Sequence, residues 1–243
     1  MTITAISLFL AFLLGIGCYH IARTEVEARR IAAGGLPRQE LFEDVAEDNR
    51  HTLGYLISGV AMGLGAELTF NLVAPMGWTD YYALLLDGGI ILFLAMGITL
   101  IWIDAETKIL PSKIIYAGGI GTLALFAAAA ISRGGWELLI PMAIAGVFYF
   151  AFYGVIWFWA PRALGFGDVR LSFFIGAALG FLSIEAAFVG FALPWMLATL
   201  AIAIAWPFGT ISSKSSIAFG PWMILGAFIA LFWGRPIVAM IAP

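Results

Sequence analysis

The sequence predicts an all-α membrane protein: a polytopic transmembrane helical bundle of about eight spans, with a short cytosolic helical hairpin after the first span. Of its 243 residues, 63% are hydrophobic and 11% are charged, whereas soluble domains are about half apolar and a quarter charged. The apolar residues form long runs, and most runs reach the ~20 residues that a helix needs to cross a bilayer. A transmembrane β-barrel would show short alternating segments instead.

The apolar runs divide the chain into three regions. The runs span residues 3–22, 53–74, 83–103, 113–132, 138–160, 169–184, 187–208 and 219–234. The sixth and eighth are short, so the count is seven or eight. The first run has no basic segment before it and is expected to be a retained helix rather than a signal peptide. We therefore predict a first transmembrane helix (1–22), a cytosolic loop without a zinc motif (23–52) and a membrane-embedded core (53–243).

The loop at 23–52 is the one long polar stretch. Thr24 followed by Glu27 is a capping-box pattern, which predicts that a short helix begins there. A second short helix would carry five carboxylates on one face, at Glu40, Glu43, Asp44, Glu47 and Asp48. This face has the charge to bind a basic peptide segment, although a run of charges is more often simply solvated.

The distribution of Lys and Arg predicts the orientation. With the 23–52 loop inside, the inner loops hold ten basic residues: Arg23, Arg29, Arg30, Arg38, Arg50, Lys108, Lys113, Arg162, Arg170 and Lys214. The outer side keeps two, Arg133 and Arg235. Cytoplasmic loops carry such an excess, and anionic lipid headgroups are the expected partners of several of these side chains. Both termini then lie outside.

Two aspartates are the candidate functional residues. Asp104 ends the third apolar run and Asp168 precedes the sixth, and an ionisable residue at such a place is a functional candidate by default. Two spans separate them, so both face the cytosol. Two carboxylates in a poorly hydrated cleft share a proton and can act as acid and base on a peptide bond. The simpler interpretation is that Asp168 is a helix N-cap and Asp104 a polar helix end.

Three motifs resemble one known family. The segment 165–171, Gly-Phe-Gly-Asp-Val-Arg-Leu, resembles the GxGD signature of type IV prepilin peptidases. The segment 104–111, Asp-Ala-Glu-Thr-Lys-Ile-Leu-Pro, is similar to that family's first catalytic aspartate with its loop and proline. The segment 218–221, Ala-Phe-Gly-Pro, is similar to the stretch before its last helix. The motifs occur in the family's order, and the resemblance covers roughly residues 83–234.

The resemblance implies an aspartic endopeptidase of the cell (inner, cytoplasmic) membrane. Such enzymes need no metal or cofactor and remove the basic leader of prepilins and pseudopilins at the cytosolic face. Their substrates, in type IV pilus assembly and protein secretion, combine a basic leader with a hydrophobic helix. Asp104 and Asp168 would be the catalytic pair. The residues that would shape the site are Gly165, Gly167, Pro111, Gly220 and Pro221, the first two because glycine allows a sharp turn and close approach of substrate.

The chain departs from the family's bifunctional members in its first loop. Those members carry paired CxxC motifs that hold zinc, whereas the loop at 23–52 has no cysteine and Cys18 is the single cysteine of the chain. Methylation of the new N-terminus is therefore not implied here. His20 and His51 are too few for a zinc site, and no feature indicates nucleic-acid binding. Two alternatives stay open: a presenilin-like intramembrane protease, and an ion- or proton-coupled transporter or channel, whose sites usually lie nearer the midplane.

Overall fold

The computed structural model describes residues 2–32, 45–73, 81–160, 164–205 and 219–241, and within these ranges the chain is an all-α bundle. The helices are α1 (Thr2–Ala32), α2 (Val45–Val73), α3 (Tyr81–Thr107), α4 (Ser112–Ser132), the 3-10 turn η2 (Trp136–Leu138), α5 (Leu139–Trp159), α6 (Phe166–Leu182), α7 (Ile184–Ala205) and α8 (Gly220–Ile241). Seven of the described helices are long and apolar enough to cross a bilayer, and α6, with 17 residues, is the shorter eighth. The predicted fold class is confirmed.

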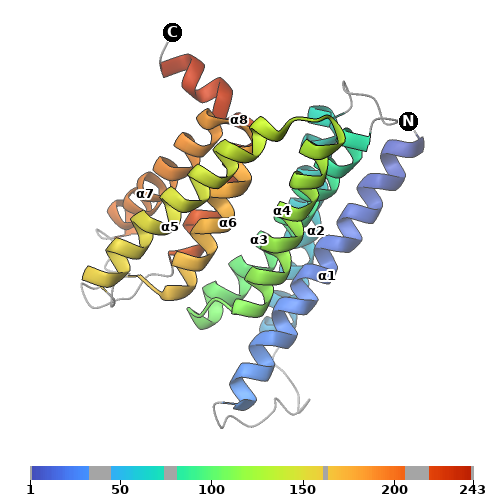
Figure 1. Ribbon diagram of the computed structural model, residues 1–243. Helices are drawn as coiled ribbons and strands as arrows, with labels where there is room; N and C mark the ends of the chain where they lie inside the picture. Colours follow the sequence, from blue (N-terminus) through green and yellow to red (C-terminus); the bar gives the residue numbers. More distant parts are fainter. Residues whose placement is uncertain (1, 33–44, 74–80, 161–163, 206–218, 242–243) are drawn as a thin grey trace.

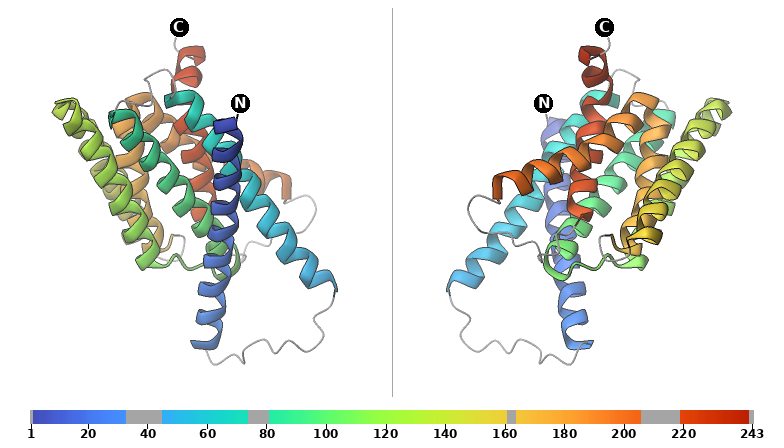
Figure 2. Two further views of the ribbon diagram at one scale, coloured as in Figure 1. Left: turned by 90° about the vertical axis from the view of Figure 1, so that its right-hand side faces the viewer. Right: turned by 90° about the vertical axis from the view of Figure 1, so that its left-hand side faces the viewer.

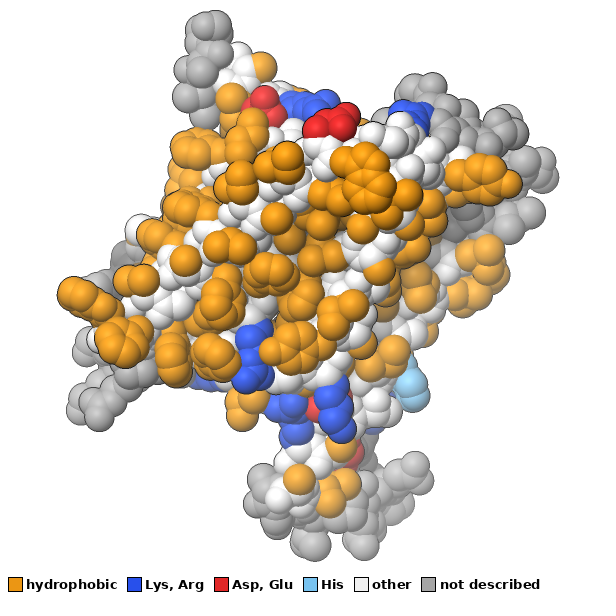
Figure 3. All heavy atoms as spheres, in the orientation of Figure 1, with side chains coloured by type: hydrophobic (Ala, Val, Ile, Leu, Met, Phe, Trp, Pro, Cys, Tyr) orange, Lys and Arg blue, Asp and Glu red, His pale blue; other side chains and the backbone are white. Residues whose placement is uncertain are grey.

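The surface is that of a membrane protein. Hydrophobic side chains cover the middle of the face shown in Figure 3, and charged side chains gather near its two ends. Large apolar side chains are exposed on several helices, for example Phe158 and Trp159 on α5 and Met196 on α7. Such a continuous apolar surface is stable in lipid but not in water. The chain is therefore a multi-pass membrane protein.

Helices that follow one another in the chain form antiparallel pairs. The pairs are α1–α2, α3–α4, α5–α6 and α7–α8, as Figure 1 shows. Contacts of α3 with α1 and α8, and of α6 with α4 and α8, join the pairs. The two chain termini lie at one end of the bundle (Figures 1 and 2). The α3–α4 and α5–α6 connections lie at the opposite end, which we call the aspartate end.

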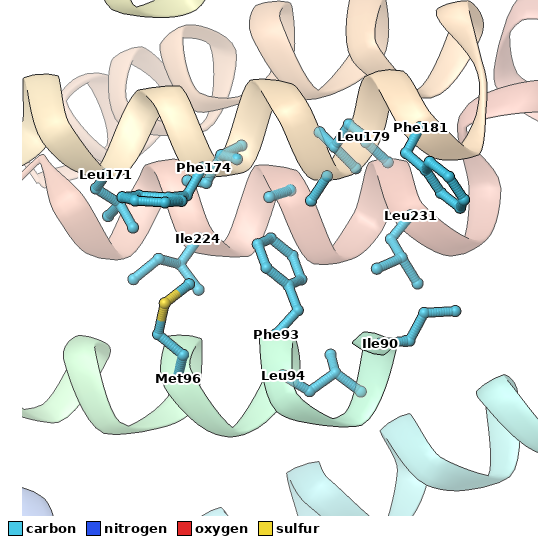
Figure 4. Packing of buried hydrophobic residues seen from close by; sticks show 14 of the residues in the cluster. Ile90, Phe93, Leu94, Met96, Leu171, Phe174, Leu179, Phe181, Ile224 and Leu231 are labelled. Atoms are coloured by element: carbon cyan, nitrogen blue, oxygen red, sulfur yellow. The ribbon is translucent and has the colours of Figure 1, made fainter. Parts of the chain in front are cut away.

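Three helices, α3, α6 and α8, form the centre of the core. Figure 4 shows their apolar side chains meeting between the ribbons. The rings of Phe93 on α3 and Phe228 on α8 pack edge to face with centroids 6.0 Å apart. Gly97 lets these two helices approach, because a Cβ there would lie 2.8 Å from Ile224 Cγ2. Each of the three central helices has one end at the aspartate end.

The hairpin predicted after the first span is built differently. The prediction that a helix begins at Thr24 is wrong, because α1 continues unbroken to Ala32. The Thr24 hydroxyl donates to the Ile21 carbonyl at 2.9 Å instead of capping a new helix, and Arg29 pairs with Glu25 at 2.9 Å one turn apart. No glycine or proline interrupts this stretch, so nothing stops the helix.

The second short helix was predicted to carry the acidic residues at positions 40–48. In the structure, the residues from Val45 onward belong to the first turns of the long helix α2. Three of the acidic residues predicted on the face of the short helix, Glu40, Glu43 and Asp44, fall outside the described residues. Glu47 and Asp48 lie on α2, but their side chains are outside the described part. Contact of this acidic face with a substrate leader therefore stays a prediction.

Candidate active site

Asp104 is held in the last turn of α3. Its side chain is 4% exposed. The helix ends just after it, because Lys108 adopts a left-handed backbone with φ of 54° while its N–H donates to the Asp104 carbonyl at 2.9 Å. The Thr107 hydroxyl donates to the Ile103 carbonyl at 2.8 Å. The buried Asp104 side chain is thus carried by a well-formed helix end.

Asp168 lies in the first turn of α6. The N-cap of this helix is Gly165, not Asp168 as the simpler interpretation holds. The Gly165 N–H donates to Asp168 Oδ2 at 3.1 Å, which is the reverse half of a capping box. One carboxylate oxygen therefore orients the side chain. The other, Oδ1, is buried and has no hydrogen-bond partner.

Gly220, the first residue of α8, lies against both aspartates. A Cβ atom on Gly220 would stand 2.7 Å from Asp104 Oδ2 and 3.3 Å from Asp168 Oδ1. Because both oxygens lie that close to one point, they are no more than 6.0 Å apart. Both are buried and unpartnered. The structure thus brings together two aspartates that are 64 positions apart in sequence, and it does so across the three central helices.

This arrangement suits acid–base chemistry. Within this upper limit on their separation, the two carboxylate oxygens can be close enough to share a proton directly or to be bridged by one water molecule. One O–H···O hydrogen bond spans about 2.7 Å, and a bridging water makes two of them. Two carboxyl groups this close in a buried place favour a state with one proton between them. The N-termini of α6 and α8 lie beside the pair, and helix N-termini stabilise the negative charge that remains.

The loop after Asp104 packs directly on the glycine motif. A Cβ on Gly167 would lie 2.9 Å from Leu110 Cβ, so a larger residue there would push this loop away. Pro111 is the N-cap of α4, and its carbonyl accepts from the N–H groups of Ile114 and Ile115 at 3.1 and 3.2 Å. Loop and motif are therefore one packed unit.

The reason expected for the two glycines needs correction. Gly134 is the only glycine with a positive φ in the described ranges, so neither Gly165 nor Gly167 makes a turn that only glycine allows. Gly165 has an extended backbone, and a Cβ on it would lie 3.3 Å from Asp168 Oδ2. Both positions require a small residue, because Gly167 packs against Leu110 and Gly165 packs against the Asp168 carboxylate.

Pro221 shapes the start of α8. It occupies the second position of that helix, where a residue without an N–H costs no hydrogen bond. The N–H groups of Trp222 and Met223 both donate to the Phe219 carbonyl, at 3.1 and 3.2 Å. Gly220 is therefore held in the first turn of a regular helix, directly over the aspartates.

Arg170 links α6 to α4. Its guanidinium donates to the Ser112 hydroxyl. It also lies 4.5 Å from the centroid of the Phe166 ring and 5.9 Å from that of Tyr116. Arg170 therefore joins the N-terminus of α6 to that of α4, next to the loop at 108–111, which we call the Leu110 loop.

An aromatic cluster beside the pair was not expected as part of the site, since the aromatic run of α5 suggests a lipid-facing or packing surface. Tyr153 on α5 is fully buried and stacks on Trp195 of α7. Its ring also lies 6.1 Å from that of Phe219, the residue before Gly220. Tyr153 is one of only two hydroxyl-bearing residues in an otherwise apolar helix, and this is the signal that could have marked it.

No metal site is evident in the described ranges, where no three His, Cys, Asp or Glu side chains are grouped as ligands. Comparison with known proteins adds no assignment: no protein-family model, curated protein or solved structure matches the chain. The motifs and the geometry of the aspartates are therefore the basis for a functional proposal.

Proposed function

We propose that the protein is a membrane-embedded aspartic endopeptidase of the prepilin-peptidase kind. One observation carries the proposal: two buried carboxylate oxygens, Asp104 Oδ2 and Asp168 Oδ1, have no partner and face one point beside Gly220. Buried polar atoms are nearly always paired in native proteins, and exceptions need a reason. A water molecule and a peptide bond placed between the two aspartates would supply the missing partners.

The reaction follows from the shared proton. The ionised carboxylate takes a proton from the water as the water oxygen bonds to the scissile carbonyl carbon. The protonated carboxyl group donates to the carbonyl oxygen, which receives the π electrons. When the tetrahedral intermediate collapses, the C–N bond breaks, a carboxyl proton passes to the leaving nitrogen, and one hydroxyl of the intermediate returns its proton to the other carboxylate as the carbonyl re-forms. The products are a carboxylic acid and an amine, and the pair regains its single proton.

The substrate class is proposed from the motifs and the membrane setting. It is a prepilin or pseudopilin with a basic leader followed by a hydrophobic helix, cut at the cytosolic face of the inner membrane. The charge distribution supports this side, because ten of the twelve Lys and Arg residues fall in the segments predicted to lie at one membrane face. The proposal covers leader cleavage alone and does not include N-methylation.

The test is cleavage of candidate prepilins on co-expression with the wild-type protein, Asp104→Asn or Asp168→Asn. Either substitution keeps the volume of the side chain but removes its ability to exchange a proton. We expect loss of the mobility shift that reports leader removal, with unchanged membrane insertion, and mass spectrometry of the mature N-terminus locates the cut. Full cleavage by either variant would falsify the mechanism. The transporter alternative would be favoured if the wild type conducted ions but cleaved no prepilin, and if the aspartate variants lost that ion flux.

A further inference from the structure

A third unpartnered polar group lies next to the aspartate pair. The Tyr153 hydroxyl is buried and has no hydrogen-bond partner, and the Tyr153 side chain is 0% exposed. The described residues contain five such buried side-chain atoms, and three belong to Asp104, Asp168 and Tyr153. A hydroxyl without a partner costs free energy wherever water is excluded. Three buried polar atoms without a protein partner, gathered in one place, indicate a site built to bind a polar ligand.

The helix register places Tyr153 level with Asp168. On the antiparallel α5–α6 pair, a Cβ on Gly154 would lie 3.8 Å from Val169 Cγ1, so positions 153 and 168 stand one residue to either side of this contact. An electrostatic interaction joins the Tyr153 hydroxyl and the Asp168 carboxylate. The Tyr153 side chain therefore lies beside the pair, with its ring 6.1 Å from that of Phe219, the residue before Gly220.

Neighbouring aromatic rings hold Tyr153 in place without satisfying its hydroxyl. The Tyr153 and Trp195 rings are 5.9 Å apart and almost parallel, at 9°. The Trp195 N–H lies near the hydroxyl oxygen, but an indole N–H can only donate, so it provides no acceptor for the Tyr153 O–H. The Phe219 ring closes the wall at 4.9 Å from Trp195. Tyr153 is thus rigidly positioned with its O–H available.

We propose that Tyr153 is a catalytic residue, whose hydroxyl donates a hydrogen bond to the scissile carbonyl oxygen of the bound peptide. The inference rests on the proposed peptidase activity. No proton leaves Tyr153: the hydroxyl supports the negative charge that grows on the oxygen when water attacks. Donors fixed in advance at that position are among the largest contributions to acyl-transfer catalysis. The ligand that pairs the hydroxyl is a peptide carbonyl.

Tyr149, one helical turn away, provides a matched control. It is also buried on α5, but its hydroxyl donates to the Ala187 carbonyl of α7. Tyr149→Phe removes a partnered hydroxyl and with it the hydrogen bond that joins α5 to α7, so its effect falls on stability. Tyr153→Phe removes an unpartnered hydroxyl, so its effect falls on catalysis. The same chemical change thus has opposite consequences at the two positions.

The experiment measures kcat, KM and the melting temperature of the purified full-length protein, with a peptide that spans the leader junction. For Tyr153→Phe we expect kcat to fall about a hundredfold, as when one oxyanion donor is removed, with KM unchanged and the melting temperature equal or higher. For Tyr149→Phe we expect a lower melting temperature and an unchanged kcat per folded molecule.

Two results would overturn the inference. One is a kcat for Tyr153→Phe within about threefold of wild type, which is too small for a lost transition-state contact. The other is a fall in melting temperature equal to that of Tyr149→Phe, which would mean that the hydroxyl has a protein partner. Inactive Asp104→Asn and Asp168→Asn beside an active Tyr153→Phe would reject Tyr153 alone. Active aspartate variants would reject the proposed function itself.

Discussion

At the residue scale, the site depends most on the absence of one atom. Gly220 begins α8, and a Cβ there would stand 2.7 Å from Asp104 Oδ2, closer than real Cβ atoms approach an oxygen. A methyl group would fill the point on which both carboxylate oxygens converge. The glycine therefore keeps open the space in which a water or a peptide bond would be bound.

Gly220→Ala is expected to lower leader cleavage by about a hundredfold, because misplacing reacting groups by about 1 Å has that effect. Fold and membrane insertion should persist, since the new methyl group is small. Rates on a junction peptide and a melting curve measure the two effects.

Gly63→Ala is the matched control, because no atom lies within 4 Å of a Cβ on that helical glycine of α2. It should keep full activity and gain stability by up to about 1 kcal/mol from helix propensity. Equal activity of the two alanine variants would show that the point beside Gly220 is not where chemistry occurs.

At the element scale, the site end is fastened by the contact between α4 and α6. The Arg170 guanidinium of α6 donates to Ser112 at the start of α4, while the Leu110 loop packs on Gly167. These contacts bind the connection that follows Asp104 to the helix that carries Asp168. The relative placement of the two aspartates therefore depends on this contact between α4 and α6, which we call the α4–α6 joint, as well as on the packing of the core.

A double-mutant cycle tests the joint. Arg170→Ala and Ser112→Ala should each lower stability, and together they should lower it by less than the sum, because they remove the same hydrogen bond. The expected coupling is about 1 kcal/mol. Unfolding of the detergent-solubilised variants measures it, and additive effects would mean that the two side chains do not interact in solution.

Sequence periodicity and run length sufficed for the helices, because lipid demands long apolar segments with satisfied backbones. They failed between residues 23 and 32, where a polar stretch with a capping pattern continues as helix because no residue breaks it. Asp104 and Asp168 were identified from their places in the spans. The contributions of Gly220 and Tyr153 depend on contacts between α3, α5, α6 and α8, and sequence spacing carries no information on which side chains meet across helices.

At the scale of the whole molecule, the two termini lie together at the end opposite to the aspartates. An even number of crossings produces this arrangement, which agrees with counting α6 as a span although it has 17 residues. A helix rises 1.5 Å per residue, so α6 reaches about 26 Å, slightly less than the ~30 Å hydrocarbon core. At least one end of α6, of which the first carries Asp168, is therefore expected to lie inside the membrane boundary.

Orientation can be measured by cysteine labelling, because Cys18 is the single cysteine and is 3% exposed. Lys113 and Ser132 are exposed at opposite ends of α4. The excess of Lys and Arg at the aspartate end predicts that this end faces the cytosol. A membrane-impermeant maleimide should then label Ser132→Cys in intact cells, and Lys113→Cys only after permeabilisation, while the wild type stays unlabelled. The reverse pattern would place Asp104 and Asp168 outside, where a basic leader held in the cytosol cannot reach them, and would exclude leader cleavage even with the aspartate geometry intact.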